Sequence, residues 1–408
     1  MIQRPEYLQW LKNAMNQRLI KVVTGVRRCG KSTMFELFQQ HLLETGVKPG
    51  RIININFEER ENQKLTNWES LYDHIAARLS PRGKHYIFLD EIQIVPDFQR
   101  AANALFTKSN VDLYLTGSNS RMKIGDWATM FRGRYIELKM LPLSFREYAD
   151  AYPFDASLDQ KFEDYLANSS FPQTALFVKG RDWDRNLIRM YLESLFDSII
   201  IKDVVESKKI REPSKLDRVV RFLFSNIGSE TSLLNISNKI KADTQGMKRE
   251  MSLHSDTVEK YLEGLLEGHV FYKATRHYIK GKEFLESHAK YYAVDVGLRN
   301  MLMGRTQEDR GHVLENVVYL ELLRRGCQVH TGRVGAREVD FVALNPRGVT
   351  EYYQVAQTLL GNEALERETA SLNAIKDHNP KFLLTRDHGF ATHNGIQHKN
   401  VLQWLLET

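Results

Sequence analysis

A short stretch near the start of the sequence, TGVRRCGKST, has the spacing G-x-x-x-x-G-K-[ST] and follows an apolar run typical of a strand. Its glycines let backbone N–H groups approach a phosphate, and a helix that begins at Lys31 favours negative charge at its N-terminus. Lys31 would neutralise the β and γ oxygens of a nucleotide, while Ser32 would bind Mg²⁺. The stretch therefore predicts a phosphate-binding loop for ATP and Mg²⁺. Its residues are Gly25, Val26, Arg27, Arg28, Cys29, Gly30, Lys31, Ser32 and Thr33.

A second stretch, HYIFLDEIQ, places two acidic residues at the end of an apolar run, about sixty residues after the loop. Asp90 would hold Mg²⁺ through water, and Glu91 would polarise the attacking water as the general base. By itself, such a pair also fits a strand end capped by acidic turn residues. Its position after a phosphate loop favours the catalytic interpretation.

A third apolar run, in VDLYLTGSNS, ends with the polar residues Thr116, Ser118 and Asn119. A polar side chain beside the acidic pair would hydrogen-bond the γ-phosphate or the attacking water. We prefer Ser118 and Asn119 for this role, and the sequence does not decide between them.

Arg132 and Arg134 surround a glycine before a further strand-like run, in FRGRYIEL. A guanidinium group there would stabilise transition-state charge as an arginine finger directed at the nucleotide of a neighbouring subunit. A solvated pair of arginines before a strand is the alternative.

The order of these features resembles that of the bacterial and archaeal AAA+ ATPases that carry an uncharacterised domain after the ATPase module. The stretches that carry the resemblance are GVRRCGKST, YIFLDEIQ, LTGSNS, FRGRYIELKMLPLSFREY and FDSIIIKDVVE. The resemblance covers essentially the whole chain. It implies a Walker A motif at Gly25 to Thr33, a Walker B motif at Asp90 and Glu91, and a sensor at Ser118 or Asn119. It also favours Arg134 over Arg132 as the finger.

The elements that must position these residues alternate in type. From Lys21 to Leu143, short β-rich apolar runs alternate with amphipathic stretches. This alternation is typical of βαβ units and a parallel sheet with helices on both faces. We therefore expect residues 1–143 to form an α/β P-loop NTPase core of the AAA+ type.

The remaining chain divides into three predicted segments. Residues 144–212 have helical patterns and predict a lid or connector. Residues 213–304 have three helical patterns and a strand pair, which predict a winged-helix-like domain. Residues 305–408 alternate between helix and strand and predict a second α/β domain. The overall fold class is α/β.

The last helix of the winged-helix-like segment, SDTVEKYLEGLLEG, tests a DNA-binding interpretation. Its periodicity predicts that Val258, Tyr261, Leu262, Leu265 and Leu266 face inward. The residues expected to face outward are Asp256, Glu259, Lys260, Glu263 and Glu267. Since phosphates repel carboxylates, we favour a structural or protein-contact role for this helix. DNA binding through a wing stays open, with the basic residues Lys273, Arg276, Lys280 and Lys282.

The last segment resembles the order of a restriction-endonuclease-like fold. Glu315 and Asp340 match the first two acidic positions, but Gln354 and Ala356 stand where a further acid and a lysine belong. Without that lysine, no group orients or deprotonates the attacking water, and two carboxylates make a weak metal site. We therefore expect a nuclease-like scaffold without cleavage activity. Five arginines would still let it hold a phosphate backbone, unless they form a solvated face: Arg324, Arg325, Arg333, Arg337 and Arg347.

The composition excludes several classes of protein. The chain has 408 residues, of which 42% are hydrophobic and 26% charged, as in a folded multidomain protein. A net charge of +6 is too small over this length to identify nucleic acid as a partner. Two cysteines are too few for a disulfide framework or a thiolate metal site, and no run approaches the roughly 18 apolar residues of a membrane span. We expect a cytoplasmic protein without membrane contact.

These features favour an AAA+ ATPase that hydrolyses ATP with Mg²⁺, forms a homo-oligomer, and contacts DNA or a protein client through its C-terminal segments. A nucleotide-gated scaffold with negligible turnover is one alternative. An ATPase-coupled nuclease is another, disfavoured by Ala356. Inside the phosphate loop, the positive field of Arg27 and Arg28 would lower the pKa of the Cys29 thiol, although an inert loop residue is the simpler interpretation.

Overall fold

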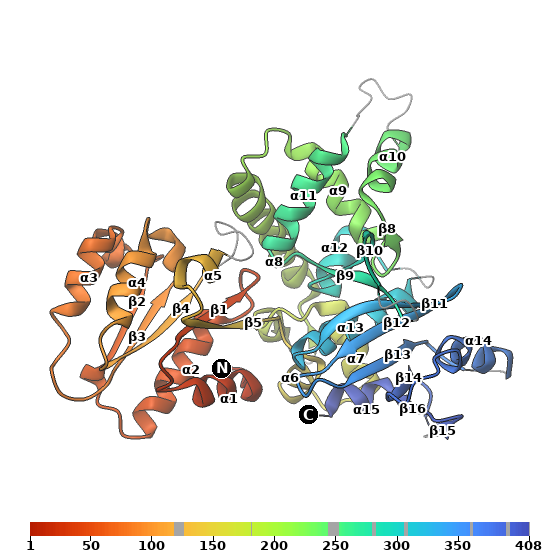
Figure 1. The fold of residues 1–408 in the computed structure, drawn as a ribbon, viewed down its shortest axis with the longest axis horizontal. Coiled ribbons are helices and arrows are strands. Elements are labelled where there is room, and N and C mark those ends of the chain that lie inside the picture. Colours follow the sequence, from red (N-terminus) through yellow and green to blue (C-terminus); the bar gives the residue numbers. More distant parts are fainter. Residues whose placement is uncertain are drawn as a thin grey trace. The chain divides into compact units, whose positions relative to one another are not determined.

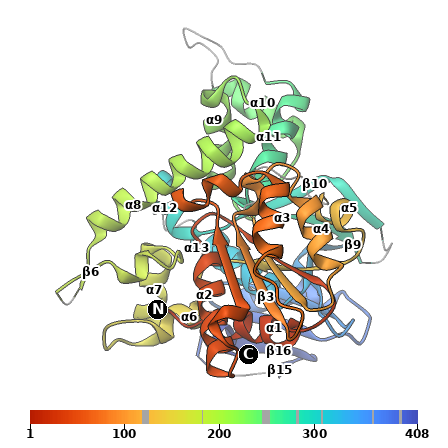
Figure 2. The same cartoon turned by 90° about the vertical axis from the view of Figure 1, so that its left-hand side faces the viewer.

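The structure is a computed structural model that describes residues 1–117, 126–180, 182–243, 253–279, 283–305, 309–359, 362–388 and 392–407. The chain forms two compact units, drawn in two orientations in Figures 1 and 2. The first comprises Met1–Pro142 and Glu267–His269, and the second comprises Leu143–Leu266 and Val270–Thr408. None of the helices in the described ranges has the length and apolar character needed to cross a membrane.

The first unit contains a five-stranded sheet in the order β2-β3-β4-β1-β5. The strands are β1 (Ile20–Gly25), β2 (Ile52–Asn56), β3 (His85–Asp90), β4 (Val111–Thr116) and β5 (Tyr135–Met140). Every neighbouring pair is parallel, with Val23 opposite Thr116 and Val22 opposite Glu137. This sheet confirms the predicted parallel α/β fold of a P-loop NTPase.

Helices cover both faces of this sheet because successive side chains of a strand point to opposite faces, and the central strands β1 and β3 are buried along their whole length. The helices are α1 (Pro5–Ala14), α2 (Lys31–Glu44), α3 (Trp68–Ala76), α4 (Phe98–Phe106) and α5 (Asp126–Phe131). On one face, Phe88 and Tyr114 stack with ring centroids 4.8 Å apart, and Phe38 of α2 contacts both rings. On the other face, Leu89 and its neighbours pack with side chains from α3, α4 and α5. Short 3-10 helices occupy Pro49–Arg51, Arg60–Leu65 and Ile92–Ile94.

The second unit begins with helices. They are α6 (Phe145–Asp150), α7 (Leu158–Asn168), α8 (Arg185–Ser198), α9 (Pro213–Ser225), α10 (Leu233–Asp243), α11 (Ser255–Glu267) and α12 (Val296–Met303). A 3-10 helix at Thr174–Leu176 and a two-stranded ribbon of β6 (Val178–Lys179) and β7 (Asp182–Trp183) precede α8. The π-helical segment Ile199–Glu206 follows α8 directly. The capping box at Ser144 and Glu147 fixes the start of α6.

A nine-stranded mixed sheet forms the rest of the second unit, in the order β15-β16-β14-β13-β12-β11-β9-β10-β8. Its strands are β8 (Glu230–Thr231), β9 (Phe271–Tyr278), β10 (Glu283–Ala293), β11 (Gln328–Val334), β12 (Arg337–Leu344), β13 (Thr350–Val355), β14 (Lys381–Thr385), β15 (Thr392–His393) and β16 (Ile396–Asn400). The helices beside it are α13 (Arg310–Arg324), α14 (Asn362–Asn373) and α15 (Val401–Leu406). Tyr352 packs in a cluster with Leu372 of α14, whereas its neighbour Tyr353 contacts Trp404 of α15. The second unit is thus a second α/β domain with a mixed sheet.

The predicted boundary between residues 304 and 305 falls inside this single sheet. The β9–β10 hairpin, expected to be the wing of a separate domain, joins the later strands because β9 pairs in parallel with β11. In the register, Thr331 lies opposite Arg276 and Arg333 lies opposite Tyr278. Strand pairing between segments distant in the sequence leaves no signal in local periodicity, which is why the sequence indicated two modules here.

Candidate nucleotide-binding site

Two glycines shape the loop between β1 and α2. Gly25 has a φ of +148°, and a Cβ atom there would lie 2.2 Å from the carbonyl oxygen of Met140 on β5. Gly30, which immediately precedes α2, has a φ of +103°. A side chain would collide at the first position and strain the backbone at the second. The glycines therefore bring the loop against β5 and lead it into the first turn of α2, where unpaired N–H groups favour an anion.

The Lys31 ammonium group folds back over this loop. Its side chain is buried, and its Nζ atom donates to the carbonyl oxygens of Gly25 at 3.1 Å and Val26 at 3.3 Å. It also lies 3.9 Å from the Oε1 atom of Glu91. These contacts hold a positive charge at the surface of the loop, where phosphate oxygens would be stronger partners than neutral carbonyls.

Asp90 and Ser32 meet at the end of β3. Asp90 is 4% exposed, and the Thr116 hydroxyl donates a hydrogen bond to its carboxylate. Burial raises the pKa of Asp90, while the nearby Ser32 and Thr116 hydroxyls oppose that rise. A hydroxyl and a carboxylate are oxygen donors of the kind that Mg²⁺ prefers, so this pair fits the metal role predicted for it.

Thr116 links the two acidic residues. Its hydroxyl donates to Asp90, and its Oγ1 atom accepts the backbone N–H of Glu91 at 2.9 Å. Sequence reasoning named Thr116 but preferred Ser118 and Asn119, which lie outside the described residues. The position of Thr116 indicates its role, because it is the last residue of β4, and β4 lies between β1, which precedes the phosphate loop, and β3, which ends at Asp90.

Glu91 sits in a strained backbone conformation. Its φ of +56° lies in the left-handed region, which non-glycine residues adopt infrequently. The Glu91 side chain is mostly buried, faces the Lys31 ammonium group, and accepts a hydrogen bond from Gln93. Strained conformations persist where the surrounding structure holds them, and they concentrate at functional sites. Here the backbone bond to Thr116 turns the chain so that Glu91 and Asp90 have different neighbours.

The remaining loop residues are arranged around this centre. Val26 is buried and Thr33 is half-buried. The Arg27 guanidinium lies 3.3 Å from the carboxylate of Glu58. Arg28 is exposed, with a φ of +66°.

The pKa of the Cys29 thiol is raised, whereas the sequence led us to expect a lowered pKa. Its side chain is 0% exposed, and burial raises the pKa of its thiol, outweighing the nearby positive charges of Lys31 and Arg4. The cause is geometric, because the thiol is fully buried, and Arg27 and Arg28 are not among the charges that shift its pKa. Its carbonyl oxygen accepts a hydrogen bond of 2.9 Å from the buried Arg4 guanidinium.

Arg4 was missed in the sequence because nothing near it in the chain indicates a partner. Its guanidinium also donates to the carbonyl oxygens of Leu141 at 2.9 Å and Pro142 at 3.1 Å. It therefore ties the phosphate loop to the chain that follows β5. This arrangement makes Arg4 a positioning residue for the loop.

Arg132 and Arg134 lie away from the phosphate loop of their own chain. Both are exposed, and Arg134 immediately precedes β5, where its carbonyl oxygen accepts the N–H of Ile20 at 2.8 Å. The loop follows the opposite end of β1, whose six residues span about 20 Å at ~3.3 Å per residue. A finger at Arg134 would therefore have to act on the nucleotide of another subunit. The Arg134 guanidinium lies 5.9 Å from the centre of the Phe106 ring.

Two segments of the chain match known domain families. Residues 17–149 match a family described as an AAA domain, and residues 159–309 match a domain of unknown function, DUF8612. An uncharacterized protein of Haemophilus influenzae is 34% identical over 412 residues, covering 100% of this chain and 99% of that protein. This chain belongs to the same protein family. An uncharacterized protein of Methanocaldococcus jannaschii is 27% identical over 391 residues, covering 91% of this chain and 83% of that protein.

A solved structure supports the same fold. The Walker-type ATPase PabY2304 of Pyrococcus abyssi has a TM-score of 0.51 and 14% sequence identity, covering 74% of this chain and 96% of that protein. At this level of identity the likeness concerns the fold. The first unit therefore has the fold of a P-loop ATPase, in agreement with the match of residues 17–149 to the AAA domain family.

Three acidic residues of the second unit, Glu315, Glu338 and Asp340, lie around Lys290, a residue that the sequence did not single out. Lys290 of β10 is 5% exposed, and its Nζ atom lies 2.9 Å from Glu315 and 2.5 Å from Glu338. Asp340 accepts the backbone N–H of Val355 at 2.8 Å. Ala356 carries no ammonium group, as the sequence shows, but Lys290 supplies one from a different strand. Lys290 could have been recognised in the sequence as the charged residue of the otherwise uncharged run Ala289–Val294, which is buried in the structure.

The charges in this cluster depend on one another. Burial lowers the pKa of Lys290, but the carboxylates of Glu315, Asp340 and Glu338 outweigh burial and raise it, so the group is an ammonium ion. Burial and the neighbouring Glu315 raise the pKa of Asp340. The Tyr292 hydroxyl donates a further hydrogen bond of 2.6 Å to Glu315. Gln354, at the expected acid position, accepts a hydrogen bond from Ser371.

The surface residues considered for DNA divide into exposed and buried groups. On α11, Asp256, Glu259, Lys260 and Glu263 are exposed as expected. Glu267 is 8% exposed, which corrects its predicted outward position. It lies at the last position of the helix, where the chain turns back into the protein and periodicity no longer applies.

The predicted basic groups are likewise only partly accessible. On the hairpin, Lys273 is exposed, whereas Arg276 is buried in an ion pair with Glu230. Lys280 and Lys282 lie outside the described residues. Arg324 and Arg325 both pair with Glu321, while Arg337 and Arg347 are exposed and Arg333 is half-buried.

Proposed function

We propose that the protein binds ATP with Mg²⁺ at the loop between β1 and α2 and hydrolyses it. The observation that supports this proposal is a convergence of five side chains at the carboxyl ends of three neighbouring parallel strands. They are Lys31, Ser32, Asp90, Glu91 and Thr116. The carboxyl ends of parallel strands in open α/β sheets are where ligands bind.

Each side chain has a chemical role in this proposal. Lys31 exchanges its carbonyl partners for β and γ phosphate oxygens and neutralises their charge. Ser32 and Asp90 would hold Mg²⁺, which would offset the charge that develops on the transferred phosphoryl group. Glu91 accepts the proton of the attacking water. Thr116 fixes the relative orientation of Asp90 and Glu91 through its two hydrogen bonds.

We also propose that the protein works as a homo-oligomer in which Arg134 of one subunit faces the nucleotide of the next. The position of Arg134 at the edge of the sheet opposite the phosphate loop supports this arrangement. The second unit would then contact DNA or a protein client.

The test is the release of phosphate from ATP in the presence of Mg²⁺. We expect Glu91→Gln to reduce turnover by about 100-fold or more while the affinity for ATP stays within about threefold of the wild type. Glu36→Gln, which alters an exposed carboxylate on α2, is the matched control and should behave as the wild type. Wild-type protein that binds ATP without releasing phosphate, with or without DNA, would contradict the proposal and favour a nucleotide-gated scaffold.

The lysine and carboxylate cluster favours a second candidate function, cleavage of a phosphodiester bond. Glu315 and Asp340 make a weak metal site on their own, but Mg²⁺ is commonly bound by one or two carboxylates when substrate phosphate oxygens complete its coordination. The Lys290 ammonium beside them would stabilise negative charge on the phosphate. Ala356 still lacks the expected lysine, and Lys290 supports this candidate by offering an ammonium group from another strand.

Incubation with plasmid DNA and Mg²⁺ or Mn²⁺ tests this candidate. Cleavage by the wild type that is lost in Asp340→Asn would support it, provided the variant still hydrolyses ATP and melts at a similar temperature. Intact plasmid under conditions in which the protein hydrolyses ATP would leave the cluster with a structural role.

A further inference from the structure

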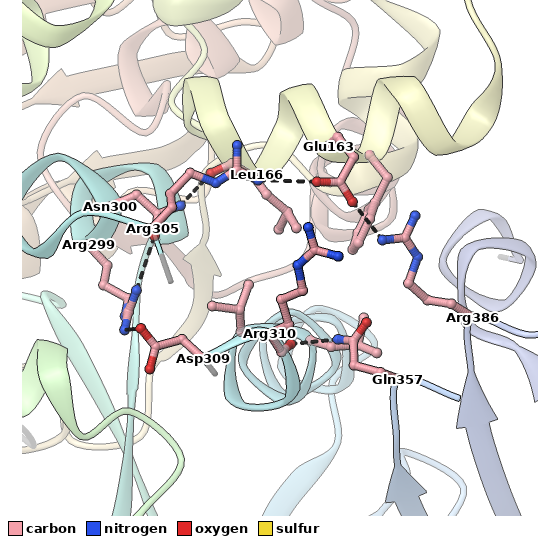
Figure 3. A pocket seen from close by; sticks show the side chains of 12 residues that line it. Glu163, Leu166, Arg299, Asn300, Arg305, Asp309, Arg310, Gln357 and Arg386 are labelled. Carbon is pink, nitrogen blue, oxygen red and sulfur yellow. Dashed lines mark hydrogen bonds and ion pairs between the residues drawn. The ribbon is translucent and has the colours of Figure 1, made fainter. Parts of the chain in front are cut away.

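The second unit contains a cavity of about 250 Å³ that neither proposed activity uses. It lies between α7, α12 and the start of α13, and the segments that follow β13 and β14 complete its wall (Figure 3). Small-molecule sites commonly measure about 300 to 1,000 Å³, so this cavity suits a small ligand.

The cavity wall carries an excess of positive charge. Four arginines and two carboxylates line it, which leaves a formal charge of +2: Arg299, Arg305, Arg310 and Arg386 against Glu163 and Asp309. The buried Arg299 pairs with Asp309 at 2.6 Å. Arg305 and Arg386 share Glu163, at 3.2 Å and 2.6 Å, and Arg386 also pairs with Asp159 at 2.8 Å. With Asp159 included, four arginines face three carboxylates, which leaves a formal charge of +1.

These ion pairs involve three of the four arginines that line the cavity, and Arg310 is the fourth. In Figure 3 its guanidinium points into the cavity, between Glu163 and Gln357. Within the described ranges of the chain, no hydrogen bond or ion pair joins this guanidinium to another group. Its backbone is held in place, because the Gln357 amide donates to the Arg310 carbonyl oxygen at 2.6 Å.

The start of α13 adds to the positive character of this end of the cavity. Arg310 is the first residue of this 15-residue helix, and the first N–H groups of a helix attract anions. The lining also includes the apolar side chains of Phe162, Leu166 and Leu314. A ligand with one charged end and one less polar part therefore matches the lining.

We propose that this cavity binds a phosphate monoester through the Arg310 guanidinium. A guanidinium group forms paired hydrogen bonds with phosphate oxygens, and a phosphate monoester offers three acceptor oxygens and up to two negative charges to this positively charged end of the cavity. The ligand is a small phosphorylated molecule or the 5′-phosphate end of a nucleic-acid strand, which present the same chemical group.

Calorimetric titration of the full-length protein with uridine 5′-monophosphate tests the proposal, with uridine as the unphosphorylated probe. Saturating ADP and Mg²⁺ keep the loop at Lys31 occupied throughout. We expect the monophosphate to bind at least about tenfold more tightly than uridine. Arg310→Gln should reduce its affinity by about tenfold or more, because a hydrogen-bonded charge partner of the phosphate is lost. Arg211→Gln, at an exposed arginine just before α9, should leave the affinity unchanged.

Folding does not confound this comparison, because the Arg310 side chain has no partner in the described structure and its replacement should leave the melting temperature unchanged. Equal affinities of the wild type and Arg310→Gln for the monophosphate, or equal affinities of the wild type for monophosphate and uridine, would overturn the proposal. Two oligonucleotides of one sequence, with a 5′-phosphate or a 5′-hydroxyl, identify the source. Tighter binding of the phosphorylated strand than of the monophosphate assigns the site to a strand end, and the reverse order assigns it to a small molecule.

Discussion

The hydroxyl of Thr116 donates a hydrogen bond to the Oδ1 atom of Asp90, so the end of β4 holds the carboxylate at the end of β3. The same hydroxyl oxygen accepts the backbone N–H of Glu91. One side chain thereby positions both the carboxylate proposed for Mg²⁺ and the carboxylate proposed as the base.

Replacing Thr116 by valine removes both hydrogen bonds and keeps the shape of the side chain. We expect turnover of ATP to fall by about 10- to 100-fold, as is usual when a group that orients a metal ligand is lost. The Mg²⁺ concentration for half-maximal activity should rise, because Asp90 is no longer held by β4. Thr116→Ser keeps the hydroxyl and should restore both values. If the valine variant has unchanged kcat and unchanged Mg²⁺ dependence, the Thr116 hydroxyl does not position Asp90 and Glu91, and the side chain contributes packing alone.

Replacing Lys31 by alanine removes the ammonium group from the loop. We expect affinity for ATP to fall by about 10- to 100-fold or more, since hydrogen bonds to charged groups contribute about 1.5–3 kcal/mol each. Lys48→Ala, at an exposed lysine of the same unit, is the matched control and should bind ATP normally. Equilibrium titration with a fluorescent ATP analogue measures both. Unchanged affinity in Lys31→Ala would refute the assignment of the loop.

The proposed finger predicts complementation between two inactive variants. Arg134→Ala should reduce turnover by about 100-fold or more, because an arginine finger contributes about 10³ or more to kcat. Mixed with Glu91→Gln, it should regain part of the activity, since a mixed oligomer contains sites with Glu91 from one subunit and Arg134 from the other. Arg132→Ala is the control and should retain turnover. Mixed oligomers that form but stay inactive would show that Arg134 does not act between subunits.

The buried cluster around Lys290 predicts a large effect on stability. Lys290→Met leaves the carboxylates of Glu315 and Asp340 without their cation, and we expect a loss of about 3–5 kcal/mol in the free energy of unfolding. Adding Glu315→Gln should recover part of this loss, because one of the uncompensated charges is removed. Lys273→Met, at an exposed lysine of the neighbouring strand, should have little effect. Denaturant titration measures these changes, and a loss below about 1 kcal/mol in Lys290→Met would contradict the account.

The phosphate loop and the first sheet could be predicted because their signals are local. The glycines, Lys31 and Ser32 are contiguous, and their spacing alone determines a strand, a tight turn and a helix. The alternation of apolar runs and helical patterns fixes a parallel sheet, since parallel strands need crossover helices. Asp90 followed from the same logic, because a carboxylate at the end of a buried strand reaches the edge at which the loop lies.

Only the tertiary structure decided which partners these residues have. Thr116 and Asp90 are separated by 26 positions and meet because β3 and β4 are neighbours in the sheet. Lys290 reaches Glu315 and Glu338 because α13 packs against β10 and β12. Strand order and helix packing are set by the burial of apolar faces over the whole unit, and no local pattern encodes them. The sequence by itself determined the chemistry of the phosphate loop, whereas packing decided the partners of Asp90, the charge balance around Lys290, and the cavity at Arg310.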